Sequence, residues 1–137
     1  LKAWEHCFFY LVAMEAKDER WYTYGISSDV LSRVSYYRRA ADSAVLVEAV
    51  RASRLMANCA EAYVQAYGAD LRFVPSERIS GTVSESLVRS KGSVDVWLDA
   101  AAWAEVADGS DGVDVALERR GNILGAAEDL AAGFGRL

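Results

Sequence analysis

The stretch "WYTYGISSDVLSR", residues 21–33, joins an aromatic run to a helical pattern and decides how the first half of the chain is organised. Its first part, "WYTYGI" (21–26), is rich in the aromatic residues that favour β-strands. Asp29 and the two serines before it carry side-chain oxygens that can cap a helix N-terminus. Apolar residues then recur at helical spacing as far as Tyr37, with Arg33 at the edge of their stripe. The stretch therefore predicts a strand that turns directly into a helix.

The segments on either side complete a small α+β pattern. "HCFFYLVAM" (6–14) predicts a strand that forms a hairpin with the aromatic run, and "AVLVEAV" (44–50) predicts a third strand. "RLMANCAEAYVQAY" (54–67) has an apolar stripe at helical spacing, and "VSESLVRS" (83–90) is interpreted as a further short helix. This order predicts an α+β fold with a small three-stranded antiparallel sheet flanked by helices.

The C-terminal part of the chain differs in composition. Residues 91–137 are rich in Ala, Gly and Asp, and predict one helix around Trp97 and another over 113–132. We therefore expect a domain over residues 1–90 and a C-terminal helical extension over 91–137 that packs on it. The helices of the extension are candidates for contacts with a partner protein or a second copy of the chain.

Length and composition place the chain among globular proteins. It has 137 residues, of which 53% are hydrophobic, and this is enough for a domain with its own core. No apolar run is long enough to cross a bilayer, so no membrane association is expected. Cys7 and Cys59 are too few for a disulfide framework, and their apolar neighbours favour buried, reduced thiols. These features predict a cytoplasmic protein.

The charge is spread unevenly along the chain. A net charge of −5 argues against a nucleic-acid partner. However, residues 30–60 hold five arginines and two acidic residues, whereas residues 61–137 have a net charge of −6. The basic stretch is either a phosphate-facing patch or a set of solvated helix and strand faces. Arg38 and Arg39, at the end of the predicted helix, are candidates for contacts with a substrate.

Several positions follow one another at a characteristic spacing. They are Tyr10 in "FFYLV", Gly25 and Ser27 in "TYGIS", Arg33, Tyr37 in "RVSYY" and Glu61 in "CAEAYVQAY". Over about residues 6–75 their order and spacing resemble the GIY-YIG nuclease superfamily. "YTYG" (22–25) most resembles a phage-associated branch whose second motif reads Tyr-Lys-Ile-Gly, which is compatible with an origin in a phage or mobile element.

The resemblance implies a DNA endonuclease that depends on Mg²⁺ or Mn²⁺ and hydrolyses phosphodiester bonds. It implies that Glu61 holds the metal ion and that Arg33 is catalytic. It also implies that Tyr10 helps to deprotonate the nucleophile, with Tyr37 near the attacking or leaving group. The second-motif positions Thr23, Gly25 and Ser27 would then lie against the substrate.

Elementary chemistry agrees with these roles. A carboxylate such as Glu61 suits a hard cation that prefers oxygen ligands. An arginine can make forked hydrogen bonds to a phosphate, which lysine does less well. A phenol such as that of Tyr10 is a poor base at its free pKa of about 10, so its role requires a nearby cation. The single histidine, His6, offers neither a zinc site nor a nucleophile–histidine pair.

Two positions depart from the motif pattern. Thr23 stands where the second-motif Tyr is expected, and the alternation of a strand directs Tyr22 and Tyr24 to the other face of the sheet. Phe8 stands at the Gly of the first motif. A catalytically degenerate domain that acts as a binding, assembly or inhibitor module is therefore the alternative function. A small α+β interaction domain with accidental motif matches is a third interpretation.

The position of Glu61 leaves two structural alternatives open. On a helical wheel it lies away from the large apolar residues, as a solvated helix glutamate would. It reaches a cleft only if the small face of Ala57, Ala60 and Val64 packs on the sheet. Tyr10 has a comparable alternative, as an aromatic residue at the edge of the core. The catalytic hypothesis requires all these side chains to converge on one concave face.

Overall fold

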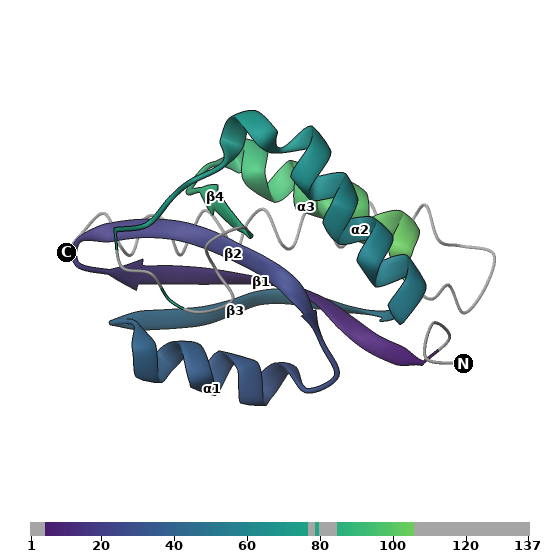
Figure 1. Cartoon of the computed structure of the whole chain (residues 1–137), viewed down its shortest axis with the longest axis horizontal. Coiled ribbons are helices and arrows are strands. Elements are labelled where there is room, and N and C mark those ends of the chain that lie inside the picture. The colour runs from purple at the N-terminus through teal and green to yellow at the C-terminus, as the bar shows by residue number, and fades with distance from the viewer. Residues whose placement is uncertain (1–4, 77–78, 80–84, 106–137) are drawn as a thin grey trace.

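The computed structural model describes residues 5–76, 79 and 85–105 of the chain. These residues form a four-stranded sheet, three α-helices and a short 3-10 helix (Figure 1). In chain order the elements are β1 (His6–Ala16), β2 (Glu19–Ser27), α1 (Val30–Ala40), β3 (Ser43–Ser53), α2 (Arg54–Tyr67), η2 (Ala69–Leu71), β4 (Ser86–Val88) and α3 (Lys91–Ala104).

The sheet is antiparallel, with the strand order β3-β1-β2-β4. Lys17 and Asp18 connect β1 and β2 with positive φ angles of 50° and 65°, the geometry of tight hairpin turns. The predicted α+β class and antiparallel sheet are confirmed. The predicted number of three strands is wrong, because the segment 83–90, interpreted as helical, contains β4. A three-residue strand is too short to show a period, and its pairing with residues Trp21 to Thr23 of β2 decides its conformation.

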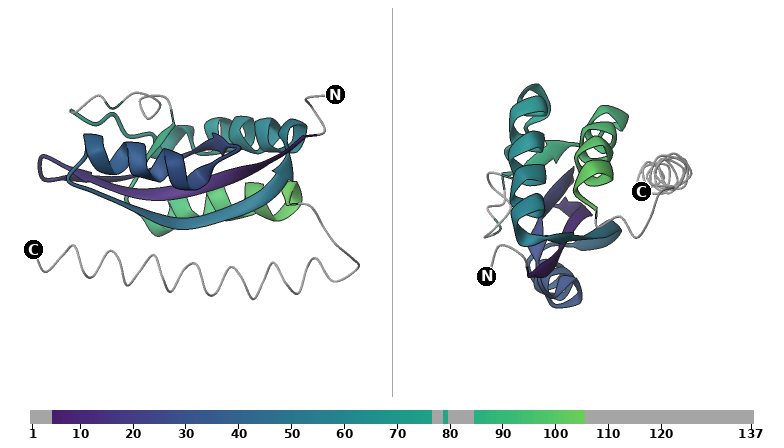
Figure 2. Two further views of the ribbon diagram at one scale, coloured as in Figure 1. Left: turned by 90° about the horizontal axis from the view of Figure 1, so that it is seen from below. Right: turned by 90° about the vertical axis from the view of Figure 1, so that its right-hand side faces the viewer.

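Helices cover both faces of the sheet. Figures 1 and 2 show α2 and α3 side by side on one face and α1 on the other. Alternation along β1 serves both layers: Phe9 and Leu11 belong to the core under α2 and α3, whereas Tyr10 and Val12 belong to the core under α1. Side chains from one strand therefore reach two separate hydrophobic layers.

Helix α2 packs on the sheet through its small residues. Ser53 caps its N-terminus by accepting a hydrogen bond from Met56 N–H at 3.2 Å. The buried residues of the helix are Ala57, Ala60 and Val64. The alternative in which this small face meets the sheet is therefore confirmed.

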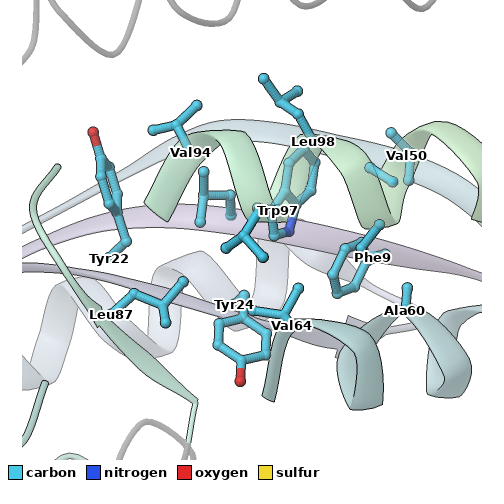
Figure 3. Packing of buried hydrophobic residues seen from close by; sticks show 14 of the residues in the cluster. Phe9, Tyr22, Tyr24, Val50, Ala60, Val64, Leu87, Val94, Trp97 and Leu98 are labelled. Atoms are coloured by element: carbon cyan, nitrogen blue, oxygen red, sulfur yellow. The ribbon is translucent and has the colours of Figure 1, made fainter. Parts of the chain in front are cut away.

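Helix α3 completes the core above β1. The indole ring of Trp97 stacks on Phe9 with a centroid separation of 5.1 Å, and its Nε1–H donates to the carbonyl oxygen of Tyr10 at 3.0 Å (Figure 3). The helix predicted around Trp97 is confirmed, and it shares its core with the elements before residue 91. The helix predicted over 113–132 lies outside the described residues.

Two further expectations concern the burial of the cysteines and the absence of a membrane-spanning segment. Cys7 is buried as predicted, but Cys59 is exposed on the outer side of α2, so the prediction of a second buried thiol is wrong. Within the described ranges, no helix combines the length and the apolar character needed to span a membrane.

Candidate active site

The candidate site lies at the edge of β2, where its pairing with β4 ends. Strand β4 pairs only with Trp21 to Thr23, and one further bond joins Tyr24 N–H to the carbonyl oxygen of Glu85 at 3.1 Å. Beyond that bond, side chains from both faces of the sheet can meet around the open edge. They form a shallow cleft of about 140 Å³. Its lining residues are Tyr10, Tyr24, Gly25, Ile26, Arg33, Tyr37, Glu61 and Glu85.

The two tyrosines of the motif pattern are joined across the wall of this cleft. The hydroxyl groups of Tyr10 and Tyr37 share a hydrogen bond of 2.7 Å, and both side chains are buried. Tyr10 pairs with Gly25 in the β1–β2 register. A Cβ atom on Gly25 would lie 2.7 Å from the Tyr10 hydroxyl oxygen, so only glycine lets the Tyr10 ring cross β2 towards its open edge.

Replacing Gly25 by alanine is expected to lower the free energy of unfolding by about 1–3 kcal/mol, because the new methyl group overlaps Tyr10. Urea unfolding followed by circular dichroism measures this change. Gly92→Ala is the matched control, because the nearest atom to its Cβ lies at 3.8 Å. Adding Tyr10→Phe to Gly25→Ala should restore part of the loss. Equal stability of Gly25→Ala and Gly92→Ala would contradict the close contact.

Helix α1 brings Arg33 to the cleft beside Tyr37. Asp29 caps the helix by accepting from Ser32 N–H at 3.1 Å, so Arg33 lies within the first turn and Tyr37 one turn later on the same side. The Arg33 side chain is partly buried. Its positive charge favours ionised Tyr10 and Tyr37, but burial outweighs it and raises the pKa of both phenols above the usual value. Both tyrosines are therefore protonated at neutral pH.

Glu61 reaches the same cleft from the opposite face of the sheet. The buried small face of α2 turns Glu61 towards the β2 edge, where its side chain is partly buried. Burial, and then the negative charge of Glu85, raise the pKa of the Glu61 carboxyl above its usual range. Two carboxylates thus lie close together in one cleft, and their mutual repulsion favours a cation between them.

Glu85 is a site residue that the sequence did not indicate. It belongs to no motif, and it lies in the segment interpreted as helical. Its carbonyl oxygen accepts hydrogen bonds from Tyr24 N–H and from Thr23 Oγ1, at 3.1 and 2.9 Å. Only the pairing of β4 with β2 brings it to the cleft, and a three-residue strand gives no sequence signal for that pairing.

The second-motif residues Thr23 and Gly25 differ in their exposure to the cleft. Gly25 lines the cleft, whereas Thr23 is fully buried next to it and is held by its bond to Glu85. Tyr22 and Tyr24 belong to the core on the other face of the sheet, as the alternation predicted. Tyr24 nevertheless contributes to the cleft from that face.

Besides the fully buried Thr23, three predicted substrate contacts lie outside the cleft lining. Ser27 forms a local turn in which its Oγ accepts from Asp29 N–H at 3.0 Å. The Nε–H of Arg38 donates to the carbonyl oxygen of Ala44 at 3.0 Å, which ties α1 to β3. Arg39 is exposed in the last turn of α1. A substrate role for these three residues stays a prediction.

The donor set suits one type of cation better than others. Across residues 5–76, 79 and 85–105, no group of three or more His, Cys, Asp or Glu side chains is placed to hold a metal ion. Among the described residues that line the cleft, Glu61 and Glu85 offer carboxylate oxygens, and no histidine or cysteine lies beside them. Such a pair fits Mg²⁺ or Mn²⁺, whose remaining ligands can be waters and substrate oxygens, better than it fits zinc.

The comparisons with known proteins give no family for this arrangement. No family model matches the chain. Searches of curated proteins and of solved structures likewise gave no match. The function must therefore be inferred from the cleft itself.

Proposed function

We propose that this protein is a metal-dependent DNA endonuclease that hydrolyses phosphodiester bonds with a GIY-YIG-like catalytic domain. One observation supports the proposal above all others. Five of the six residues of the motif pattern come from β1, β2, α1 and α2, on both faces of the sheet, and line one cleft. Convergence on one cleft is what the motif interpretation requires, and it therefore supports the proposal. The convergent residues are Tyr10, Gly25, Arg33, Tyr37 and Glu61.

Arg33 is the group that binds the scissile phosphate. Among the described residues that line the cleft it is the single cation, and its partly buried position limits screening by water. A guanidinium can donate two parallel hydrogen bonds to phosphate oxygens. Because negative charge grows on those oxygens during hydrolysis, this contact strengthens in the transition state.

Glu61 and Glu85 are the groups that hold the divalent cation. In their metal-free cleft, burial and repulsion disfavour the ionised form of Glu61, and a bound cation removes both penalties. Mg²⁺ or Mn²⁺, when bound there, supplies charge stabilisation on the phosphoryl oxygens and acidifies a water ligand. Glu85 is held in place through its carbonyl oxygen by Thr23 and Tyr24.

The Tyr10–Tyr37 pair positions and moves protons at the reacting oxygens. Their raised pKa values keep both phenols protonated in the metal-free protein, so they act first as hydrogen-bond donors. The 2.7 Å bond between the hydroxyl groups lets either phenol take up the other's proton as it passes its own proton to a reacting oxygen. Arg33 provides positive charge that favours the ionised form of Tyr10, and a cation held by Glu61 would add to it.

The Arg33→Ala variant is expected to nick supercoiled plasmid at least about 100-fold more slowly than the wild type, because it loses the contact to the developing charge. The assay uses Mg²⁺ and, separately, Mn²⁺, and follows conversion of supercoiled to open circular DNA. Lys91→Ala removes an exposed positive charge at the start of α3, away from the cleft, and should change the rate less than about twofold. Nicking that is equally fast in both variants would contradict the role of Arg33.

The competing function is a degenerate domain that binds DNA or a protein without cutting. Thr23 favours it, because this fully buried residue replaces the second-motif tyrosine and its hydroxyl is engaged with Glu85. Absence of nicking with either metal, together with DNA binding that weakens in Arg33→Ala, would favour this binding module. Restoring the motif residue with Thr23→Tyr is not a clean test, because Thr23 is fully buried and has no room for a ring.

A further inference from the structure

A second cavity, of about 350 Å³, lies beside the candidate active site. The two hollows share Tyr24 as a wall. They are also contiguous along two elements, because Gln65 follows Glu61 by one turn of α2 and Ser86 follows Glu85 at the start of β4. The residues that line the second cavity are Tyr24, Gln65, Gly68, Ala69, Arg72, Ser86 and Leu87.

The walls of this cavity are fixed by backbone contacts. Arg72 forms an antiparallel bridge with Leu87. Phe73, the residue after Arg72, donates its N–H to the carbonyl oxygen of Ser86 at 3.0 Å. Gly68 ends α2, and a Cβ there would lie 2.7 Å from the carbonyl oxygen of Val64. The cavity therefore exists without any rearrangement of the described backbone, as expected of a preformed binding site.

Its chemistry complements that of the active-site cleft. Among the described residues that line it, Arg72 is the single charged one, whereas two glutamates line the cleft next to it. The Tyr24 hydroxyl is influenced by both: burial, and then the negative charges of Glu85 and Glu61, raise its pKa, whereas the positive charge of Arg72 lowers it. Figure 3 shows this hydroxyl directed away from the core around Trp97. The cavity thus offers one cation, a phenol and the Gln65 amide to a ligand.

We propose that this cavity is the subsite for the nucleotide that adjoins the scissile phosphate in the DNA strand; this inference rests on the proposed function. Arg72 contacts the phosphate of that nucleotide. The Gln65 amide, which both donates and accepts, and the Tyr24 hydroxyl form hydrogen bonds with its base. A volume above roughly 300 Å³ is in the range of cavities that enclose small organic ligands. The subsite would give the enzyme a preference for one base beside its cut.

Arg72 is tested by DNA binding in Ca²⁺, which replaces Mg²⁺ so that the DNA stays intact. The probe is a short fluorescein-labelled DNA duplex, and the readout is fluorescence anisotropy over a series of salt concentrations. Arg72→Ala should weaken binding about tenfold and reduce the slope of log affinity against log salt by about 1, since one phosphate contact is lost. Lys91→Ala removes another exposed cation, one that does not line the cavity, and should change neither the affinity nor the salt slope by more than the experimental error.

Gln65 is tested by removing bases from the probe. In a series of duplexes that each carry one abasic position, the wild type should lose affinity at the position next to the cut. Gln65→Ala should bind the intact probe more weakly and lose no further affinity at that same position. An equal abasic penalty in the wild type and in Gln65→Ala would overturn the base contact.

The outcomes separate this inference from the proposed activity. Nicking by the wild type, with binding by Arg72→Ala equal to that of Lys91→Ala, would overturn the subsite and leave the nuclease intact. Binding that depends on Arg72 and Gln65, in a protein that nicks no DNA, would support nucleotide binding by this cavity and would overturn both the activity and the placement of the cavity beside a scissile phosphate.

Discussion

Glu61→Gln is expected to abolish metal-dependent nicking and, at the same time, to make the metal-free protein more stable. Loss of a metal-binding carboxylate should lower the nicking rate about 1,000-fold, equivalent to roughly 4 kcal/mol of transition-state stabilisation. The neutral amide also relieves the burial of a charge and the repulsion from Glu85. A binding residue that costs stability in the empty protein is typical of active sites.

The gain in stability should depend on pH in a defined direction. The folded protein raises the pKa of Glu61 above the unfolded value, so the wild type is penalised once the carboxyl ionises. The penalty is absent below about pH 4, near the unfolded pKa of a glutamate, and develops as the pH rises through the folded pKa. Thermal unfolding of the wild type and of Glu61→Gln should therefore be measured from below about pH 4 to neutral pH. The midpoints of the two proteins should depend equally on pH at acid pH, and Glu61→Gln should have the higher midpoint at neutral pH.

Addition of metal should reverse the order of stability. Mg²⁺ or Mn²⁺ binds the folded wild type and should raise its unfolding midpoint, with much less effect on Glu61→Gln. Asp70→Asn is the matched control, because it removes an exposed carboxylate of η2 that lines neither cavity. A metal-induced shift in Glu61→Gln as large as in the wild type would contradict cation binding by Glu61.

Trp97→Ala is expected to lower the free energy of unfolding by about 3–5 kcal/mol, the usual cost of deleting a large buried aromatic side chain. The variant loses the stacking on Phe9 and leaves the carbonyl oxygen of Tyr10 without its indole donor. Urea unfolding followed by circular dichroism measures the loss. Such a large effect would establish that α3 belongs to the same folding unit as the sheet.

Trp103→Ala provides the control on the same helix. Its side chain is 42% exposed and its ring meets Tyr63 edge-on, so its loss should cost about 1 kcal/mol or less. Trp97→Phe should lie between the two variants, because it keeps an aromatic ring but removes the N–H donor. If Trp97→Ala and Trp103→Ala were equally stable, the packing of α3 on β1 would be wrong.

Local signals account for the parts of the fold that the sequence predicted. The hairpin, α1 and α2 each carry a complete pattern of strand aromatics, caps and helical stripes within a few residues, and Asp29 and Ser53 act as caps. Strand β4 has no such pattern, because its conformation comes from the edge of β2. The sequence does not indicate Glu85 as a site residue for the same reason. Glu85 is far from Glu61 in the sequence, and the pairing of β4 with β2 is what brings the two together.

The orientation of α2 explains why the sequence alone left two positions open for Glu61, one in solvent and one in a cleft. A helical wheel favours burial of the large residues, but the tilted rings of Tyr63 and Tyr67 contact each other with a centroid separation of 4.5 Å, and Tyr67 is 69% exposed. The small residues Ala57 and Ala60 face the sheet instead, because β1 and β2 already fill that layer with aromatic rings. Tertiary packing, which no local pattern encodes, therefore turns Glu61 into the cleft.

Plasmid nicking by the wild type, Arg33→Ala and Glu61→Gln, side by side in Mg²⁺ or Mn²⁺, tests the central claim most directly. The convergent cleft predicts that the wild type converts supercoiled DNA to open circles, that chelation of the metal stops the reaction, and that both variants are slower by about 100-fold or more. Lys91→Ala and Asp70→Asn should nick like the wild type. Nicking that persists unchanged in Arg33→Ala and Glu61→Gln would contradict the assignment of this cleft as the active site.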